Sequence, residues 1–248
     1  MSNQVPVLKS QLSPPPVKDQ FIHRIKLHRQ LQLIPNYPLT IIYAGAGYGK
    51  TVGLSRFIQD LDSKSCWLTV AEYDQHIIRL LTKMVTAIQS ASPEFGRDLM
   101  DQFNQLNQHV KDDELWTLMT MMVNEIEALN DELVLVIDDV HVLNQAHSFH
   151  KWMQLLIKHI PKNIHIVIST RHKPNWTPLQ QLKVQDDLLE IITQHLALSL
   201  DEMDHLIRDM NSIELNDDQV EDIYSLTEGW PIACSMVVQQ LSSGVSIN

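Results

Sequence analysis

The feature that most constrains the fold of this 248-residue chain is an apolar run that leads through a glycine-rich turn into a helical pattern. Residues 39–44, LTIIYA, are rich in β-branched side chains, which is typical of a strand buried within a parallel sheet. From Leu54 to Leu61, apolar residues recur at i, i+3, i+4 and i+7, so we expect an amphipathic helix that begins at or just before Lys50. A strand, a tight turn and a helix in succession form the unit of an α/β fold.

Beyond this unit, apolar runs continue to alternate with stretches of helical periodicity. Such alternation favours a parallel sheet with helices on both faces, because each crossover helix packs back onto the sheet. The expected fold class is therefore α/β. The further strands that we expect are residues 66–70, 133–138, 164–170 and 188–192, and the helices are residues 24–33, 77–88, 115–129 and 149–160.

The pattern changes near residue 198, after which three helical stretches follow one another without a strand. Ser199 with Glu202 three residues later forms a capping box, and Asn216 resembles a second helix start. We therefore expect a small all-helical subdomain at this end of the chain. The expected divisions are an extended lead-in and first helix in residues 1–38, the α/β domain in residues 39–197 and the helical subdomain in residues 198–248.

The turn after the first strand reads YAGAGYGKTV in residues 43–52. In a turn of this kind the backbone N–H groups wrap a phosphate, and the N-terminus of the following helix adds partial positive charge. Lys50 can reach the β- and γ-phosphates, and the hydroxyl of Thr51 can ligate Mg²⁺. The pattern G-x-x-x-x-G-K-[ST] is complete except that Ala44 replaces its first glycine. We predict that a nucleotide is bound by Gly45, Ala46, Gly47, Tyr48, Gly49, Lys50, Thr51 and Val52.

The expected strand LVLVID, residues 133–138, ends in Asp138, and a second acid, Asp139, follows directly. Ligands of open α/β sheets collect at the carboxyl ends of strands, so these acids should lie near the glycine turn. We predict that Asp138 and Thr51 hold Mg²⁺ and that Asp139 orients or deprotonates an attacking water. Arg171 follows a third strand, where it either contacts the γ-phosphate or is simply exposed. The predicted catalytic residues are Asp139, Lys50 and Arg171.

Composition bounds the class of protein. No window approaches the roughly 18 apolar residues of a membrane helix, and no apolar signal segment is found at the start, so we expect a cytoplasmic protein without a membrane partner. A net charge of −11 argues against nucleic acid as a partner of this chain. Residues 1–60 carry seven Lys or Arg and two acids, whereas residues 186–222 carry twelve acids and one base. Either the basic segment surrounds the glycine turn as part of an anion site, or both segments are ordinary solvated surfaces of opposite sign. Cys66 and Cys234 lie in apolar settings and are expected to be reduced core residues.

These motifs, in this order and spacing, resemble the N-terminal ATPase region of MalT-like transcriptional activators, the large LuxR-type regulators of the STAND class of P-loop NTPases. AGAGYGKT is similar to the phosphate loop of that family, and LVLVIDDVHVL is similar to its Walker B segment. TEGWPIACSMV resembles the Gly-x-Pro motif of its helical subdomain. The resemblance spans essentially the whole chain and implies ATP or ADP with Mg²⁺ as the bound cofactors.

The resemblance also implies roles for residues outside the phosphate loop. Arg24 matches an arginine that packs near the adenine, Pro231 matches a proline that lines the base and ribose, and Trp230 adds an apolar wall. Pro231 has a plain structural interpretation as well, as the first residue of a helix. Lys183 and Gln185 stand where the family usually has arginines, so any report on nucleotide state through that segment would differ here.

The resemblance implies a molecular switch that hydrolyses ATP slowly. ADP would hold a closed form and ATP an open, self-associating form, while an inducer and DNA would be bound by other regions of a longer chain. Two alternatives stay open. A small-molecule kinase would need a lid rich in arginine, and residues 171–248 offer only Arg171 and Arg208. A nucleotide-binding scaffold without turnover is argued against by the intact Lys50, Thr51, Asp138 and Asp139.

Overall fold

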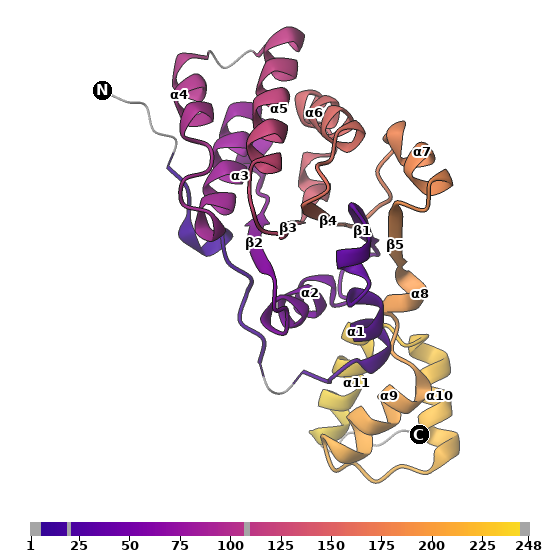
Figure 1. The fold of residues 1–248 in the computed structure, drawn as a ribbon. Coiled ribbons are helices and arrows are strands. Elements are labelled where there is room, and N and C mark those ends of the chain that lie inside the picture. Colours follow the sequence, from indigo (N-terminus) through magenta and orange to yellow (C-terminus); the bar gives the residue numbers. More distant parts are fainter. Residues whose placement is uncertain (1–5, 19–20, 107–109, 244–248) are drawn as a thin grey trace.

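The computed structural model describes residues 6–18, 21–106 and 110–243. Its centre is a parallel sheet of five strands in the order β2-β3-β4-β1-β5 (Figure 1). Because all neighbouring pairs are parallel, the carboxyl ends of the strands meet at one edge of the sheet. The strands are β1 (Leu39–Tyr43), β2 (Lys64–Thr69), β3 (Leu133–Asp138), β4 (Ile164–Thr170) and β5 (Leu188–Ile192).

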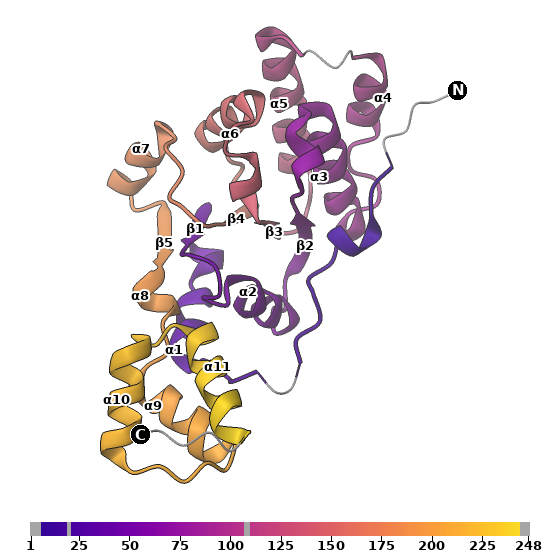
Figure 2. The same cartoon turned by 180° about the vertical axis from the view of Figure 1, so that it is seen from behind.

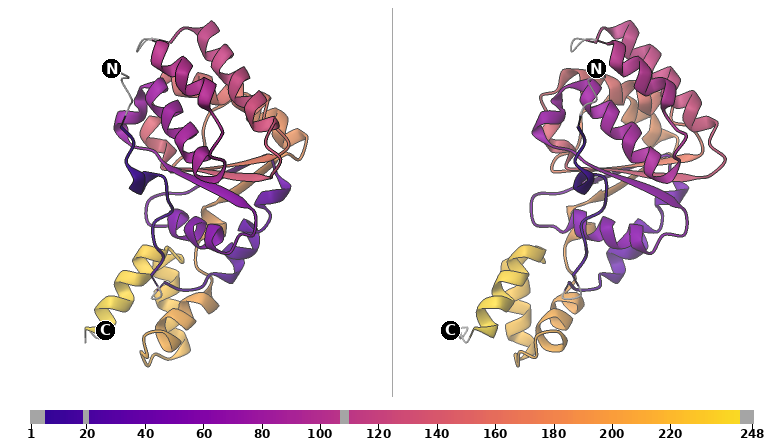
Figure 3. Two further views of the ribbon diagram at one scale, coloured as in Figure 1. Left: turned by 60° about the vertical axis from the view of Figure 1, so that its left-hand side comes forward. Right: turned by 90° about the vertical axis from the view of Figure 1, so that its left-hand side faces the viewer.

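Helices cover both faces of the sheet, as Figure 3 shows from the side. Successive side chains of a strand point to opposite faces, so Ile41 joins one buried cluster and Ile42 the other. One face is covered by α3 (Ile77–Ala91), α4 (Arg97–Gln105), α5 (Asp112–Glu127), α6 (His147–Lys158) and α7 (Pro178–Val184). The other is covered by α1 (Ile25–Leu31), α2 (Lys50–Gln59) and α8 (Thr193–Leu196). The predicted α/β fold with a two-sided parallel sheet is confirmed.

Three further helices form a third buried cluster, which lies beyond α1 and α2 and away from α3 to α6 (Figure 2). Leu198, Met203, Ile223 and Cys234 are among its buried members. Its elements are α9 (Leu200–Asp204), which continues into a π-helical turn η5 (His205–Asp209), then α10 (Asp217–Thr227) and α11 (Pro231–Ser242). We call these elements the helical subdomain; the exact division of the chain at residue 198 stays a prediction.

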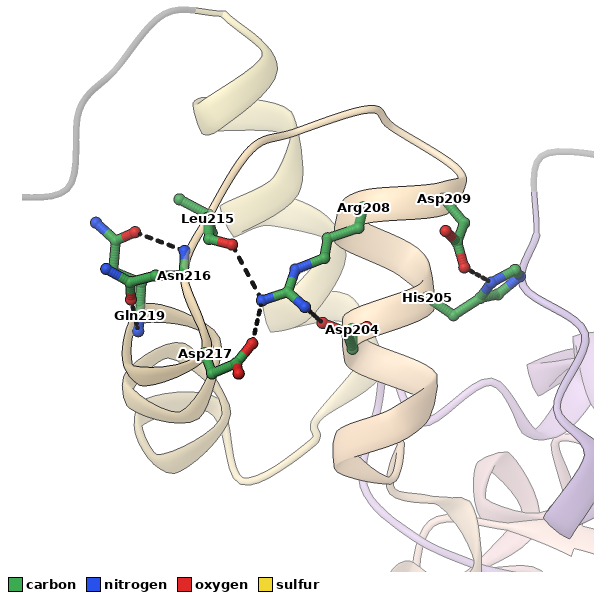
Figure 4. Close-up of polar contacts among 8 residues, drawn as sticks. All are labelled: Asp204, His205, Arg208, Asp209, Leu215, Asn216, Asp217 and Gln219. Carbon is green, nitrogen blue, oxygen red and sulfur yellow. Dashed lines mark hydrogen bonds and ion pairs between the residues drawn. The ribbon is translucent and has the colours of Figure 1, made fainter.

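Polar contacts fasten the helices of this subdomain to one another (Figure 4). Arg208 of η5 donates to the carbonyl oxygen of Leu215 at 3.0 Å and to Asp217 Oδ1 at 2.7 Å, and it pairs with Asp204 at 3.0 Å. The expected caps at both helix starts are present. The side chain of Ser199 accepts from the backbone N–H of Glu202 at 3.2 Å, and that of Asn216 accepts from Gln219 at 2.9 Å.

A buried ion pair lies beside the end of β2. Lys83 and Asp74 are 2% and 0% exposed, and Lys83 Nζ donates to Asp74 Oδ2 at 2.7 Å. The same ammonium donates to the carbonyl oxygen of Thr69 at 2.6 Å. Arg79 lies farther from the same carboxylate, with Nε 3.7 Å from Asp74 Oδ1. Charges this deeply buried persist only when they are paired, and Lys83 is the nearer partner of Asp74.

Several elements differ from the expectation. The helices α4, α7 and α8 were not predicted, because each is short and presents few buried side chains to give a periodic signal. The strand β2 begins two residues early, at Lys64, since pairing with β3 extends beyond the apolar run. The first strand ends at Tyr43 and α1 begins at Ile25. Short 3-10 helices complete the fold at η1 (Lys9–Gln11), η2 (Ile34–Asn36), η3 (Glu72–Gln75) and η4 (Val140–Leu143).

Two composition-based expectations can be compared with the structure. Cys66 and Cys234 are buried in different core clusters, as predicted, and their thiols are free. Among the helices of the described residues, none combines the length and the apolar character that a bilayer crossing requires.

Candidate nucleotide-binding site

The loop between β1 and α2 has the geometry of a phosphate cradle. Gly47 and Gly49 have φ angles of 78° and 75°, a region that a side chain disfavours, and α2 begins directly afterwards at Lys50. Within the described part of the chain, the backbone N–H groups of residues 45–49 have no hydrogen-bond acceptor. Free amides at the start of a helix are donors for an anion, so the predicted loop residues fit a phosphate group.

Lys50 and Thr51 make hydrogen bonds within the protein that contacts with a nucleotide and a metal ion could replace. Lys50 is 9% exposed, and its ammonium donates to the carbonyl oxygens of Ala44 at 2.7 Å and Gly45 at 2.9 Å. Burial lowers the pKa of Lys50, and the nearby Asp138 and Asp139 act in the opposite direction. The hydroxyl of Thr51 donates to Asp138 Oδ2 at 2.8 Å, so the two predicted metal ligands are in direct contact.

The carboxyl of Asp138 is buried, and in the described part of the chain only one of its two oxygens accepts a hydrogen bond. Asp138 is 1% exposed, and its Oδ1 has no hydrogen bond of standard geometry among the described residues. Burial raises the pKa of this carboxyl, whereas the hydroxyls of Ser169 and Thr51 lower it. An orphaned carboxylate oxygen beside a threonine hydroxyl suits a hard cation that prefers oxygen ligands, so these residues fit Mg²⁺.

The three predicted catalytic residues lie at the same edge of the sheet. Asp139 follows β3 with a φ angle of 61°, an uncommon conformation for a residue with a side chain, and its carboxylate is 46% exposed. Arg171 follows β4 and is exposed, and its charge acts on both Lys50 and His141. His141, which stands two residues after Asp139 in the motif DDVH, was not among the predicted site residues.

The helical subdomain contacts the phosphate loop directly. Trp230 donates from Nε1 to the carbonyl oxygen of Ala46 at 3.0 Å, and its ring stacks on Tyr48 with 6.2 Å between the ring centroids. The backbone N–H of Ile232 donates to the carbonyl oxygen of Gly47 at 3.2 Å. A Cβ on Gly47 would lie 2.5 Å from Ile232 Cγ2, so the absence of a side chain at this position allows the close approach.

Arg24 connects the phosphate loop to residues 196–198, which lead into the helical subdomain and which we call the hinge. Its guanidinium donates to the carbonyl oxygens of Tyr48 at 3.2 Å, Leu196 at 2.5 Å and Ala197 at 3.2 Å. Within this hinge, the N–H of Leu198 donates to the carbonyl oxygen of Gly229 at 2.8 Å. The two terminal nitrogens of Arg24 are therefore bound to backbone carbonyls of two separate segments, whereas Nε has no hydrogen-bond partner among the described residues.

A cavity of about 400 Å³ opens between α1, the start of α2 and α11. Its walls are mainly apolar, and they include the predicted residues Val52, Arg24 and Pro231. Trp230, predicted as an apolar wall, is absent from its lining and binds the loop instead. The volume lies within the range of about 300 to 1,000 Å³ that is usual for ligand pockets.

The two departures from the expected arginines lie apart from this cavity. Lys183, at the end of α7, pairs with Glu190 Oε2 at 2.9 Å, and Lys173 pairs with the other oxygen at 2.5 Å. Burial acts to raise the pKa of Glu190, but the two lysines outweigh it and hold the pKa below its ordinary value. Gln185 is exposed.

Comparisons with known proteins agree with this geometry. The sequence profile of the family described as "Nephrocystin 3, N-terminal" matches residues 21–171. The HTH-type transcriptional regulator MalT of Yersinia enterocolitica is 28% identical over 231 residues, which are 93% of this chain and 25% of that protein. The chain thus spans about a quarter of the length of the curated relatives it matches.

Two solved structures share the fold. A Signal Transduction ATPase with Numerous Domains (STAND) protein with a tetratricopeptide repeat sensor from Pyrococcus horikoshii has a TM-score of 0.62 at 19% identity, over 95% of this chain and 31% of that one. A Walker-type ATPase of Pyrococcus abyssi has a TM-score of 0.51 at 15% identity, over 94% and 71% of the two chains. At these identities the likeness shows the fold and leaves the assignment of individual site residues a prediction.

Proposed function

Because the chain belongs to the nephrocystin-3 N-terminal family and is a MalT-like STAND NTPase region, we propose that it is an ATP-binding switch module of a signal-responsive transcriptional activator. In this proposal ADP holds the helical subdomain closed, ATP favours an open and self-associating form, and slow hydrolysis resets the switch. The inducer and DNA are assigned to other regions of a longer chain.

One observation carries the proposal: the candidate site is shared between the sheet and the helical subdomain. Trp230 and Ile232 bind the carbonyls of Ala46 and Gly47, and the cavity takes walls from both α2 and α11. A ligand in that cavity touches both parts, so its affinity depends on how they are placed. A nucleotide shifts such an equilibrium only by the difference between its affinities for the two forms.

The residues of the site have separate roles in the proposed hydrolysis. Lys50 exchanges its two carbonyl acceptors for phosphate oxygens and compensates their charge. Thr51 and Asp138 would hold Mg²⁺, which when bound neutralises charge on the phosphates. Asp139, with its half-exposed carboxylate, orients or deprotonates the attacking water, and Arg171 stabilises charge on the γ-phosphoryl group as it passes from ADP to that water.

In this proposal ADP and ATP are distinguished by the terminal phosphate. The helical subdomain contacts Ala46 and Gly47 on one side of the loop, whereas Asp139 and Arg171 lie at the carboxyl edge of the sheet, near Lys50. The γ-phosphate of ATP would add contacts at that edge, and both nucleotides would share the cavity next to the helical subdomain. Full conversion from 1% to 99% open requires about a 10⁴-fold difference in affinity between the two forms.

The first experiment identifies the nucleotide and its anchor. We expect the purified chain to release ADP or ATP on denaturation, and to bind Mg²⁺·ADP in calorimetry. Lys50→Ala should abolish tight binding, because the phosphates lose their buried cationic partner. Lys64→Ala is the matched control, since Lys64, the first residue of β2, lies on the surface and pairs with Asp131. Equal affinity in Lys50→Ala and the control would place the site elsewhere.

The second experiment separates a switch from the two alternatives. Single-turnover hydrolysis of labelled ATP by the unmodified chain and by Asp139→Asn tests for catalysis at the site. We expect slow release of phosphate that Asp139→Asn reduces further. Equal rates above background would remove Asp139 from catalysis, and no phosphate release above background would favour a nucleotide-binding scaffold. Transfer of label to an added small-molecule acceptor would favour a kinase.

A further inference from the structure

His141 occupies a position beside Asp139 that the proposed roles do not use. It lies on η4, its side chain is 14% exposed, and its Nδ1 is 3.6 Å from Asp139 Oδ1. This nitrogen is buried and has no hydrogen-bond partner among the described residues. The carboxylate of Asp139 is 46% exposed, so it has more freedom to turn than the imidazole beside it.

The surroundings of His141 disfavour its protonated form. Burial and the charge of Arg171 lower its pKa, with Lys50 and His172 in the same direction and Asp139 opposed. A neutral imidazole has one N–H donor and one bare nitrogen. The ring can therefore give a single directed hydrogen bond to a carboxylate without adding another positive charge next to Lys50 and Arg171.

We propose that His141 is a positioning residue for Asp139: in the nucleotide-loaded site its Nδ1–H donates to Asp139 Oδ1 and leaves Oδ2 directed at the attacking water. The present separation exceeds a charge-assisted hydrogen bond of about 2.7 to 2.9 Å by less than 1 Å, a gap that rotation of the exposed carboxylate can close. A base that is itself oriented by a third group is a recurrent arrangement in hydrolytic sites. The inference rests on the proposed function, because it deepens the chemistry of the same site.

Two substitutions separate positioning from simple packing. His141→Asn keeps an N–H donor near the place of Nδ1, whereas His141→Leu fills similar space without a donor. In single-turnover hydrolysis at saturating Mg²⁺·ATP, we expect His141→Leu to be slower by about 10- to 100-fold, the scale of loss for a misplaced reacting group, and His141→Asn to retain most of the rate. ADP affinity should stay within about twofold in both.

A double variant tests whether His141 acts through Asp139. Once Asp139→Asn has removed the carboxylate, adding His141→Leu should cause no further loss, because the two residues act as one unit. Equal losses in the Leu and Asn variants, in proportion to lowered thermal stability, would show that the ring only fills space and would overturn the inference.

A second measurement does not depend on turnover. In the full chain with Mg²⁺ and a non-hydrolysable ATP analogue, ¹⁵N spectra of the His141 ring should show the proton on Nδ1. A ring protonated on Nε2 alone would refute the inference. If the unmodified chain binds ATP but never hydrolyses it, the hydrolytic part of the proposed function fails while the tautomer still decides the role of His141. If it hydrolyses ATP and His141→Leu is equally fast, only the inference fails.

Discussion

Replacing Trp230 tests whether the helical subdomain closes on the phosphate loop. The side chain makes one hydrogen bond, from Nε1 to the Ala46 carbonyl at 3.0 Å, and one stacked contact with Tyr48. The hydrogen bond lies near solvent and is worth about 0.5 to 1 kcal/mol net, and the aromatic pair adds about 0.5 to 1.5 kcal/mol. Trp230→Ala should therefore weaken closure by about 1 to 2.5 kcal/mol, or about 5- to 60-fold in the closed-to-open ratio.

The assay is the dissociation rate of a fluorescent ADP analogue, measured by stopped flow with excess unlabelled ADP. The proposed function requires the helical subdomain to open before the nucleotide leaves, so Trp230→Ala should speed dissociation by up to that factor. Trp230→Phe keeps the ring and should fall between Trp230→Ala and the unmodified chain. The matched control is Trp116→Ala on α5, across the sheet, where the indole is 49% exposed. Dissociation rates within twofold of the unmodified chain, together with unchanged hydrogen exchange in the loop, would refute the reasoning.

Three further predictions concern stability. Lys83→Met should cost up to about 3 to 5 kcal/mol in urea unfolding, because the buried Asp74 then keeps only the longer contact with Arg79 at 3.7 Å, and adding Asp74→Leu should recover most of the loss. Gly229→Ala should loosen the helical subdomain, since the φ angle of Gly229 is 67° and the new Cβ would lie 2.3 Å from the Leu198 carbonyl oxygen. We expect a cost of about 1 to 3 kcal/mol in thermal unfolding and faster hydrogen exchange at the hinge. Despite burial, the lysine partners hold the pKa of Glu190 below its ordinary 4.5, so the pair stabilises the fold above that pH and loses this effect as pH falls through the lowered pKa. Melting temperatures of Glu190→Gln and the unmodified chain should therefore differ at neutral pH and converge under acid.

Local signals account for the parts of the fold that were predicted. Each of the five strands contains a short apolar run, which is rich in β-branched residues in β1, β3 and β4, and each cap depends on residues three apart. Both signals can be recognised without tertiary information. The helix α4 was missed because only Leu99 and Phe103 of its nine residues are buried, and they become a face only against α3 and α5. The start of β2 was missed because it depends on pairing with β3.

In the candidate site, too, some residues were predicted from the sequence and others were not. Gly47, Lys50 and Thr51 follow from spacing, because a glycine turn before a helix implies a cradle of amides. The contact of Thr51 with Asp138, 87 positions apart, was expected from the rule that ligands bind at the carboxyl edge of a parallel sheet. The place of His141 beside Asp139 was not, because a histidine after a strand carries no signal of where its ring will lie.

The sequence by itself determined the strand–loop–helix unit, the acids at the end of β3 and the alternation that makes the sheet parallel, since each depends on residues within a few positions of one another. The tertiary structure alone decided that Trp230 binds Ala46 across 184 positions and that Arg24 joins the loop to the hinge. Those contacts depend on how three separate cores pack, and no local pattern encodes the distance between two elements that meet only after the chain has folded.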